Sequence, residues 1–195
     1  MTRVVAGAAR GRRLAVPPGD ATRPTSDRAR EALFSSLGAL IGAWAGRRFL
    51  DLYAGSGAVG LEALSRGAAH ALLVESDPRV VRTLAANADT VGLPGAVVRQ
   101  GRAERVVADG LAGRPYDVVF ADPPYALADD DLRSVLADLR PQLAGDAVIA
   151  VERPTRGGAW AWPAGYDGLR SRRYGEATLW YGRATSGPDQ SQENQ

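Results

Sequence analysis

The chain has 195 residues, of which 45% are hydrophobic, and a formal net charge of +2 at pH 7. This length suits one globular domain with a sizeable core. The absence of cysteine excludes disulfides and a cysteine nucleophile, and the single histidine, His70, argues against a metal site, so we expect none. Neither a run of roughly 18 apolar residues nor a secretory signal is present, which predicts a cytoplasmic protein without membrane contact.

Residues 1–25 indicate a basic arm that precedes the main domain. Short apolar pieces alternate with Gly and Arg and lead into a Pro-rich loop, a pattern typical of a β-hairpin followed by a loop. Every basic residue of the chain is an arginine, and seven of the 24 lie between Arg3 and Arg30. This clustering points to contact with phosphate.

A helical pattern begins at Asp27 and continues to Trp44. Five buried strands are predicted after it, separated by helix-length segments, at residues 49–53, 71–75, 96–100, 117–122 and 147–151. Because parallel neighbours need a long crossover, this alternation predicts a parallel sheet with helices on both faces. Residues 169–174 and 177–182 predict a C-terminal hairpin, so the α/β sheet is mixed and seven-stranded. We assign residues 26–184 to this domain and expect a disordered tail at residues 185–195.

The first strand ends in a glycine-rich turn, DLYAGSGAVG at residues 51–60, and a helix follows at once. Gly55 and Gly57 are expected to let the backbone approach a ligand, and Gly60 to permit close packing of helix on strand. The next strand ends at Glu75, where a carboxylate can accept hydrogen bonds from both hydroxyls of a ribose. The two features together predict a nucleoside-containing cofactor.

The glycine turn alone does not distinguish NAD from S-adenosylmethionine, since both present an adenosine to this part of an open sheet. Asp51, directly before the glycines, favours the second cofactor. A carboxylate attracts an ammonium and a sulfonium, whereas it repels a pyrophosphate.

The fourth strand runs into Asp122-Pro123-Pro124-Tyr125. If the first and fourth strands are neighbours, this tetrapeptide lies beside the glycine turn at the carboxyl edge of the sheet. The Asp122 carboxylate and the Pro123 carbonyl can each accept one N–H of an aromatic amine and so point its lone pair at a methyl donor. Pro124 holds residue 123 extended, and Tyr125 offers an aromatic face to a base. The sequence therefore predicts methylation of an exocyclic amine.

These motifs resemble the bacterial 16S ribosomal RNA guanine-N2 methyltransferase family. The resemblance rests on Gly11-Arg12, RPTSDRAREALF at residues 23–34, residues 51–68, DPPY at residues 122–125 and Val151-Glu152, and it leaves out only the tail. It implies a Rossmann-like class I methyltransferase fold and a monomer. It also implies the family's usual substrate, guanine 966 of 16S ribosomal RNA in the assembled 30S subunit.

The same resemblance implies roles for individual residues. S-adenosylmethionine would be bound by Asp51, Tyr53, Gly55, Ser56, Gly57, Glu75, Ser76, Arg102, Ala103 and Asp122, and the target amine would be held by Asp122, Pro123, Pro124 and Tyr125. RNA would be contacted by Arg10, Arg12, Arg13, Arg23, Thr25, Arg28 and Arg30. Arg102 departs from the pattern, because similar enzymes carry Asp or Asn there and Arg has no acceptor for the adenine amino group.

Three other functions stay open on the sequence alone. A DNA adenine-N6 methyltransferase would use the same tetrapeptide, although it usually needs an added target-recognition domain. An NAD-dependent dehydrogenase is permitted by the glycine turn, but no substrate domain follows. A non-enzymatic RNA-binding protein would explain the arginines and leave residues 122–125 without a purpose.

Overall fold

The computed structural model describes residues 2–17 and 27–185. Two of the predicted RNA contacts, Arg23 and Thr25, lie outside these residues, as does the tail beyond residue 185. The elements in chain order are β1 (Thr2–Arg3), β2 (Arg13–Leu14), α1 (Asp27–Ile41), β3 (Arg48–Asp51), α2 (Ala58–Ser65), β4 (His70–Glu75), α3 (Pro78–Val91), β5 (Ala96–Gln100), α4 (Ala103–Ala108), β6 (Tyr116–Ala121), α5 (Asp129–Leu139), η1 (Arg140–Gln142), β7 (Leu143–Pro154), η2 (Thr155–Gly157), β8 (Tyr166–Tyr174) and β9 (Ala177–Ala184).

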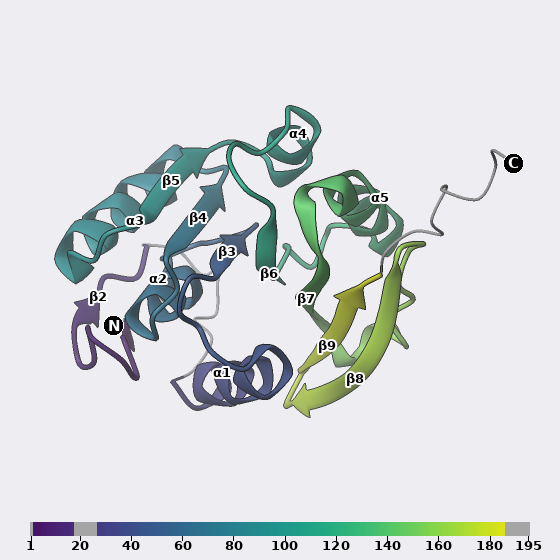
Figure 1. Cartoon of the computed structure of the whole chain (residues 1–195), viewed down its shortest axis with the longest axis horizontal. Coiled ribbons are helices and arrows are strands. Elements are labelled where there is room, and N and C mark those ends of the chain that lie inside the picture. Colours follow the sequence, from purple (N-terminus) through teal and green to yellow (C-terminus); the bar gives the residue numbers. More distant parts are fainter. Residues whose placement is uncertain (1, 18–26, 186–195) are drawn as a thin grey trace, which may run out of the picture.

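The main sheet has seven strands in the order β5-β4-β3-β6-β7-β9-β8 (Figure 1). The first five of these strands are parallel, and β9 and β8 add antiparallel pairs at one end. This confirms the predicted mixed seven-stranded α/β sheet with a C-terminal hairpin. The predicted neighbours, β3 and β6, pair in register from Phe49 opposite Val118 to Asp51 opposite Phe120. The glycine turn and the DPPY tetrapeptide therefore leave the sheet at the same edge.

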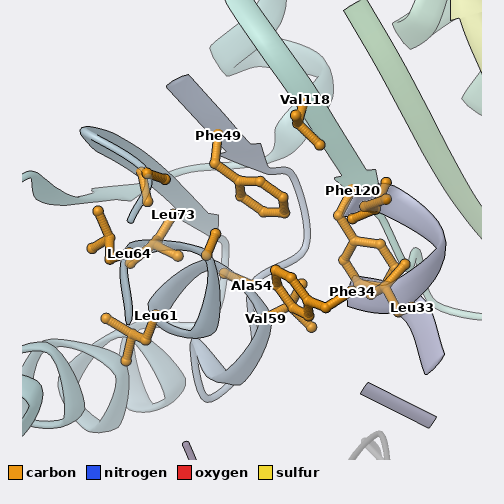
Figure 2. Packing of buried hydrophobic residues seen from close by; sticks show 14 of the residues in the cluster. Leu33, Phe34, Phe49, Ala54, Val59, Leu61, Leu64, Leu73, Val118 and Phe120 are labelled. Carbon is orange, nitrogen blue, oxygen red and sulfur yellow. The ribbon is translucent and has the colours of Figure 1, made fainter. Parts of the chain in front are cut away.

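Helices cover both faces of the sheet because successive strand residues alternate between two cores. One core joins Phe49 and Phe120 to residues of α1, α2 and α3, and Figure 2 shows Phe34 of α1 beside these strands. The other core joins Leu50 and Val119 to α4 and α5. Strands buried on both faces require nearly continuous apolar runs, which is the pattern that the sequence shows.

The turn between β4 and α3 has a fixed geometry that positions the end of β4. The Asp77 side chain accepts a hydrogen bond from the Arg79 N–H at 2.7 Å, and Pro78 occupies the first turn of α3. The helix ends at Gly92, which has φ 59°. Within residues 2–17 and 27–185, no helix is both long enough and apolar enough to cross a bilayer.

The arm folds as the predicted hairpin of β1 and β2 and docks on α2 through a buried carboxylate. Glu62 accepts hydrogen bonds from the backbone N–H groups of Val5 at 2.7 Å and Ala6 at 3.0 Å. The same carboxylate pairs with Arg66 at 2.7 Å and lies 3.7 Å from the Arg30 guanidinium. The Glu62 and Arg30 side chains are fully buried.

This burial corrects one prediction. Arg30 was expected to face RNA, but its guanidinium is enclosed by Glu62, by Asp27 at 3.0 Å and by the carbonyl of Arg3. A buried arginine paired with two carboxylates has no surface to offer to phosphate. Its role is to join α1, α2 and the arm.

Candidate active site

Residues from four adjacent parallel strands meet at the carboxyl edge of the sheet. Asp51 ends β3, Glu75 ends β4, Arg102 follows β5 and Asp122 follows β6. Ligands of open α/β sheets bind beyond this edge. The structure therefore brings the predicted cofactor residues and the predicted catalytic residues to one place.

The glycines of the turn have different roles. Gly55 has φ 53°, and a Cβ added to it would meet nothing within 4 Å, so the space above it is open. A Cβ on Gly57 would lie 2.3 Å from Leu84 Cδ1, and one on Gly60 would lie 2.0 Å from Leu73 Cδ2. The packing role of Gly60 is confirmed. The missing side chain of Gly57 also makes room for α3, and its predicted role beside a ligand stays a prediction.

Glu75 is held against the glycine turn by backbone N–H groups. Its Oε2 accepts from Gly55 at 3.0 Å, and its Oε1 accepts from Ser76 at 2.6 Å and from Asp77 at 2.9 Å. The Ser76 hydroxyl also donates to Oε1, at 3.4 Å. Oε2 accepts from Gly55 alone among the described residues, so one of its two lone-pair positions remains for a ligand. The geometry fixes a negative charge beside the open space at Gly55.

Asp51 is a buried carboxylate, 1% exposed, whose charge is only partly satisfied. Its Oδ2 accepts a hydrogen bond from the Gly60 N–H at 3.0 Å, while Oδ1 has no hydrogen-bond partner among the described residues. Burial raises the pKa of Asp51 to about 7, and the charges of Asp122 and Glu75 add to this rise. This concentration of negative charge favours a cationic ligand and disfavours a pyrophosphate.

Tyr53, Arg102 and Ala103 border the site on the α4 side. Tyr53 packs against the second core, and burial followed by the charge of Glu104 raises the pKa of its hydroxyl. The Arg102 side chain is 77% exposed and pairs with Glu104 at 3.4 Å. Arg102 thus points to solvent, and only the backbone of Arg102 and Ala103 is left to meet an adenine there.

The DPPY tetrapeptide presents acceptors and an aromatic ring beside Asp51. Asp122 is half-buried and Pro123 is buried, whereas the Tyr125 side chain is 65% exposed. The Pro124 carbonyl accepts the Leu127 N–H at 2.9 Å, but no described residue donates to the Pro123 carbonyl. Burial raises the pKa of Asp122, although Arg153 opposes the rise. The arrangement can hold an amine by two oxygen acceptors.

Three residues near the tetrapeptide were not assigned to the site from the sequence. Glu152 and Arg153 lie near the end of β7, which pairs with β6. Trp160 lines a cavity of about 170 Å³ beside Tyr125. Arg153 donates to the Leu127 carbonyl at 2.7 Å and pairs with Asp129 at 2.6 Å. Of these three residues, the sequence indicated only Glu152, because the Val151-Glu152 dipeptide is part of the family resemblance. Among the described residues, no group of three or more His, Cys, Asp and Glu side chains is placed to hold a metal ion.

The predicted RNA-binding arginines that remain are exposed. They are Arg10, Arg12, Arg13 and Arg28. Arg12 also has a structural contact, because its guanidinium donates to the Thr90 carbonyl at 2.9 Å and to the Val91 carbonyl at the end of α3. Four residues before Val91, Asn87 of α3 donates to the Ser56 carbonyl of the glycine turn at 2.8 Å and to the Ala15 carbonyl at 2.9 Å, so Arg12 lies only about 6 Å from this contact along the helix axis. The arm and the glycine turn are therefore joined through α3.

Replacing Gly55 with Ala is expected to weaken S-adenosylmethionine binding at least tenfold, because the new Cβ enters the open space over the turn. Gly110→Ala is the matched control. Gly110 also has positive φ, 85°, and open space at its Cβ, but it lies after α4, at the opposite edge of the sheet. Both variants carry similar backbone strain, of about 1–2 kcal/mol. Calorimetric titration that finds equal affinities for both would contradict the assignment of this space.

Comparison with known proteins agrees with this site. The family model described as Conserved hypothetical protein 95 matches residues 2–183. Ribosomal RNA small subunit methyltransferase D of Escherichia coli (strain K12) is 38% identical over 176 residues, which cover 89% of this chain and 85% of that protein.

Solved structures show the same relationship. The E. coli protein yhhF, provisionally described as a methyltransferase, has a TM-score of 0.80 at 36% identity and covers 95% of this chain and 98% of its own. The ribosomal RNA methyltransferase aviRa from Streptomyces viridochromogenes has a TM-score of 0.67 at 19% identity, covers 90% of both chains and supports the fold alone. The chain therefore belongs to the Conserved hypothetical protein 95 family and is a class I methyltransferase related to ribosomal RNA small subunit methyltransferase D.

Proposed function

We propose that this protein transfers a methyl group from S-adenosylmethionine to the exocyclic N2 of a guanine in 16S ribosomal RNA within the 30S subunit. The observation that carries the proposal is the pair of acceptors, the Asp122 carboxylate and the unengaged Pro123 carbonyl, beside the glycine turn. The relatives' names, which specify small-subunit ribosomal RNA, support the substrate class. The resemblance noted in the sequence implies guanine 966 as the target.

The residues present fit S-adenosylmethionine. The buried Asp51 Oδ1 lacks a partner among the described residues, Gly55 leaves open space, and Glu75 is fixed beside that space. Glu75 would hold the ribose hydroxyls and the Asp51 charge would attract the cationic end. Ser56, Gly57 and Ser76 would line the site, and the backbone at Arg102 and Ala103 would meet the adenine. When bound, the cofactor supplies an electrophilic methyl carbon on a sulfonium.

The chain's own residues would orient and deprotonate the amine. The lone pair of an aromatic amine is delocalised into the ring, so the amine is a poor nucleophile until it is held in another geometry. The Asp122 carboxylate and the Pro123 carbonyl each accept one N–H, and the lone pair then faces the methyl group. Tyr125 stacks on the base. Because burial raises the pKa of Asp122, this carboxyl can take the proton that leaves after the methyl has moved.

The function is tested by incubating the protein with labelled S-adenosylmethionine and undermethylated 30S subunits, in parallel with naked 16S RNA and with DNA. Digestion then identifies the labelled nucleoside. We expect N2-methylguanosine from the 30S sample alone. Label in N6-methyladenosine or its deoxy form would keep the chemistry and overturn the substrate, and absence of label from all samples would overturn both.

The exposed arginines of the arm are proposed to contact ribosomal RNA, in a cytoplasmic protein that acts as a monomer. Replacing Arg10 and Arg13 with Ala is expected to weaken binding to 30S subunits and to flatten its salt dependence, by about one unit of slope for each phosphate that the variant no longer neutralises. Arg114→Ala, at an exposed position before β6, is the control. Filter binding across a salt series measures the slope, and an unchanged slope in the double variant would contradict the phosphate contacts.

A further inference from the structure

Glu152 lies beside Asp122 at the catalytic edge, on the neighbouring strand. β6 and β7 pair in parallel up to Ala121 opposite Val151, so Asp122 and Glu152 are the next residues of each strand. Side chains alternate between the faces of a sheet. Phe120 and Ala150 belong to the first core, while Ala121 and Val151 belong to the second. By this alternation Asp122 and Glu152 occupy the same face, side by side.

Asp51 continues this row of carboxylates on a third strand. It pairs with Phe120 in register, two residues before Asp122. Its side chain faces α2, where the Gly60 N–H donates to it, so it shares the face of Asp122. The tetrapeptide thus has one carboxylate on the cofactor side, Asp51, and one on the far side, Glu152. A base whose amine is held at Asp122 would extend toward Glu152.

The Glu152 carboxylate is engaged by no other part of the described chain. It makes no hydrogen bond and no ion pair with residues 2–17 and 27–185, although the side chain is half-buried. The adjacent arginine, Arg153, points to the other face and pairs with Asp129 and the Leu127 carbonyl. Burial raises the pKa of Glu152, and the neighbouring Asp122 charge adds to the rise. A half-buried acceptor of this kind costs stability unless a ligand supplies a donor.

The base edges differ in the donor that they could offer. Guanine presents N1–H directly beside its N2 amino group, whereas adenine presents an unprotonated acceptor, N1, beside its N6 amino group. If Asp122 and Pro123 hold the amine, the next ring position faces Glu152. The ionised Glu152 carboxylate can accept from N1–H of guanine and would meet the lone pair of adenine N1 with repulsion. Since burial and the Asp122 charge raise the pKa of Glu152 to about 8, we expect this discrimination to strengthen as the pH rises through that value.

We propose that Glu152 determines the base specificity of the reaction by accepting a hydrogen bond from N1–H of the target guanine. This assignment rests on the proposed guanine-N2 activity and adds a residue to it. Glu152 contacts the substrate base without taking part in methyl transfer itself. Removal of the acceptor should therefore lower the rate on guanine, and it should not lower the rate on a base whose amino group lies beside an unprotonated N1.

The test compares 30S subunits reconstituted with guanine or with 2-aminopurine at the target position, since 2-aminopurine keeps the amino group and lacks N1–H. Two variants are matched in size: Glu152→Gln keeps an oxygen acceptor and Glu152→Met does not. We expect Glu152→Met to lower kcat/KM on guanine by about 10- to 100-fold. Its kcat/KM on 2-aminopurine should stay the same or rise, because the variant removes the repulsion between the carboxylate and the unprotonated N1. Glu152→Gln should retain a preference for guanine.

Asp146→Ala, an exposed acidic position at the other end of β7, is the control and should leave both rates within twofold. Equal losses on both bases in Glu152→Met, or an unchanged rate on guanine, would overturn the role of Glu152 while the proposed function stands. A wild-type protein that methylates neither substrate would overturn the proposed function and this assignment together. Circular dichroism of each variant confirms that the compared proteins are folded.

Discussion

Asp122→Ala is expected to lower kcat for methyl transfer by about 10²- to 10³-fold while the affinity for S-adenosylmethionine stays within a few-fold of wild type. The side chain is assigned to the amine, and loss of one precisely aimed polar group or a small misplacement of a reactant typically has this cost. The variant should also fold normally. Because burial raises the pKa of Asp122, the ionised carboxylate is less stable in the fold than in water, so its removal relieves a cost. Single-turnover kinetics with 30S subunits measures the rate.

Asp122→Asn separates the two functions of the carboxylate. The amide oxygen can still accept one N–H, so part of the orientation is retained, but the amide cannot take the proton. We expect a rate between those of wild type and Asp122→Ala. Titration calorimetry supplies the affinity for S-adenosylmethionine. Turnover by Asp122→Ala at the wild-type rate would remove the carboxylate from the mechanism, and a large loss of cofactor affinity would move it to the cofactor site.

The fold was predictable because most of the parallel strands are short and buried on both faces. The predicted burial of residues 96–100 was wrong, because β5 is the edge strand of the sheet, has no buried residue and leaves Val97 45% exposed. Runs such as residues 71–75 and 96–100 are largely apolar, and the first of these differs from the observed β4 by one residue. The long strand β7 was predicted only at residues 147–151, whereas it spans Leu143–Pro154. Its extension depends on pairing with β9, where Pro154 lies opposite Ala177. Such tertiary pairing leaves no local pattern in the sequence.

The site was predictable where its residues are consecutive in the chain. The glycine turn and residues 122–125 carry their geometry in local sequence, and the pairing of β3 with β6 joins them. Glu152 reaches the site because β7 pairs with β6 in one particular register, and a single sequence does not specify that register. Arg30 misled the prediction, because a charged residue is normally exposed and only the fold supplies its buried partner, Glu62. The packing role of Gly57 was missed, since its close neighbour, Leu84, is 27 positions away in the sequence.

Glu62→Ala is expected to produce the largest loss of stability of any substitution considered, about 3–5 kcal/mol in the free energy of unfolding. The change leaves the Arg30 guanidinium buried without its carboxylate in α2, and it removes the acceptor of the Val5 and Ala6 N–H groups. For a chain of this length, the expected fall in Tm is about 10 °C. Urea unfolding followed by circular dichroism measures the free energy.

Glu31→Ala provides the control, since Glu31 also pairs with an arginine of this cluster, Arg66 at 3.6 Å, but its side chain is 57% exposed. Its loss should cost at most about 1 kcal/mol. Glu62→Gln should fall between the two, because the amide oxygen still accepts from the arm while the charge opposite Arg30 is gone. If Glu62→Ala were no more destabilising than Glu31→Ala, the buried pair would not be what fastens the arm. The arm would then depend on its other contacts, such as the Ala9 N–H donating to the Ser65 hydroxyl of α2 at 2.9 Å and the Ala15 N–H donating to Asn87 of α3 at 2.8 Å.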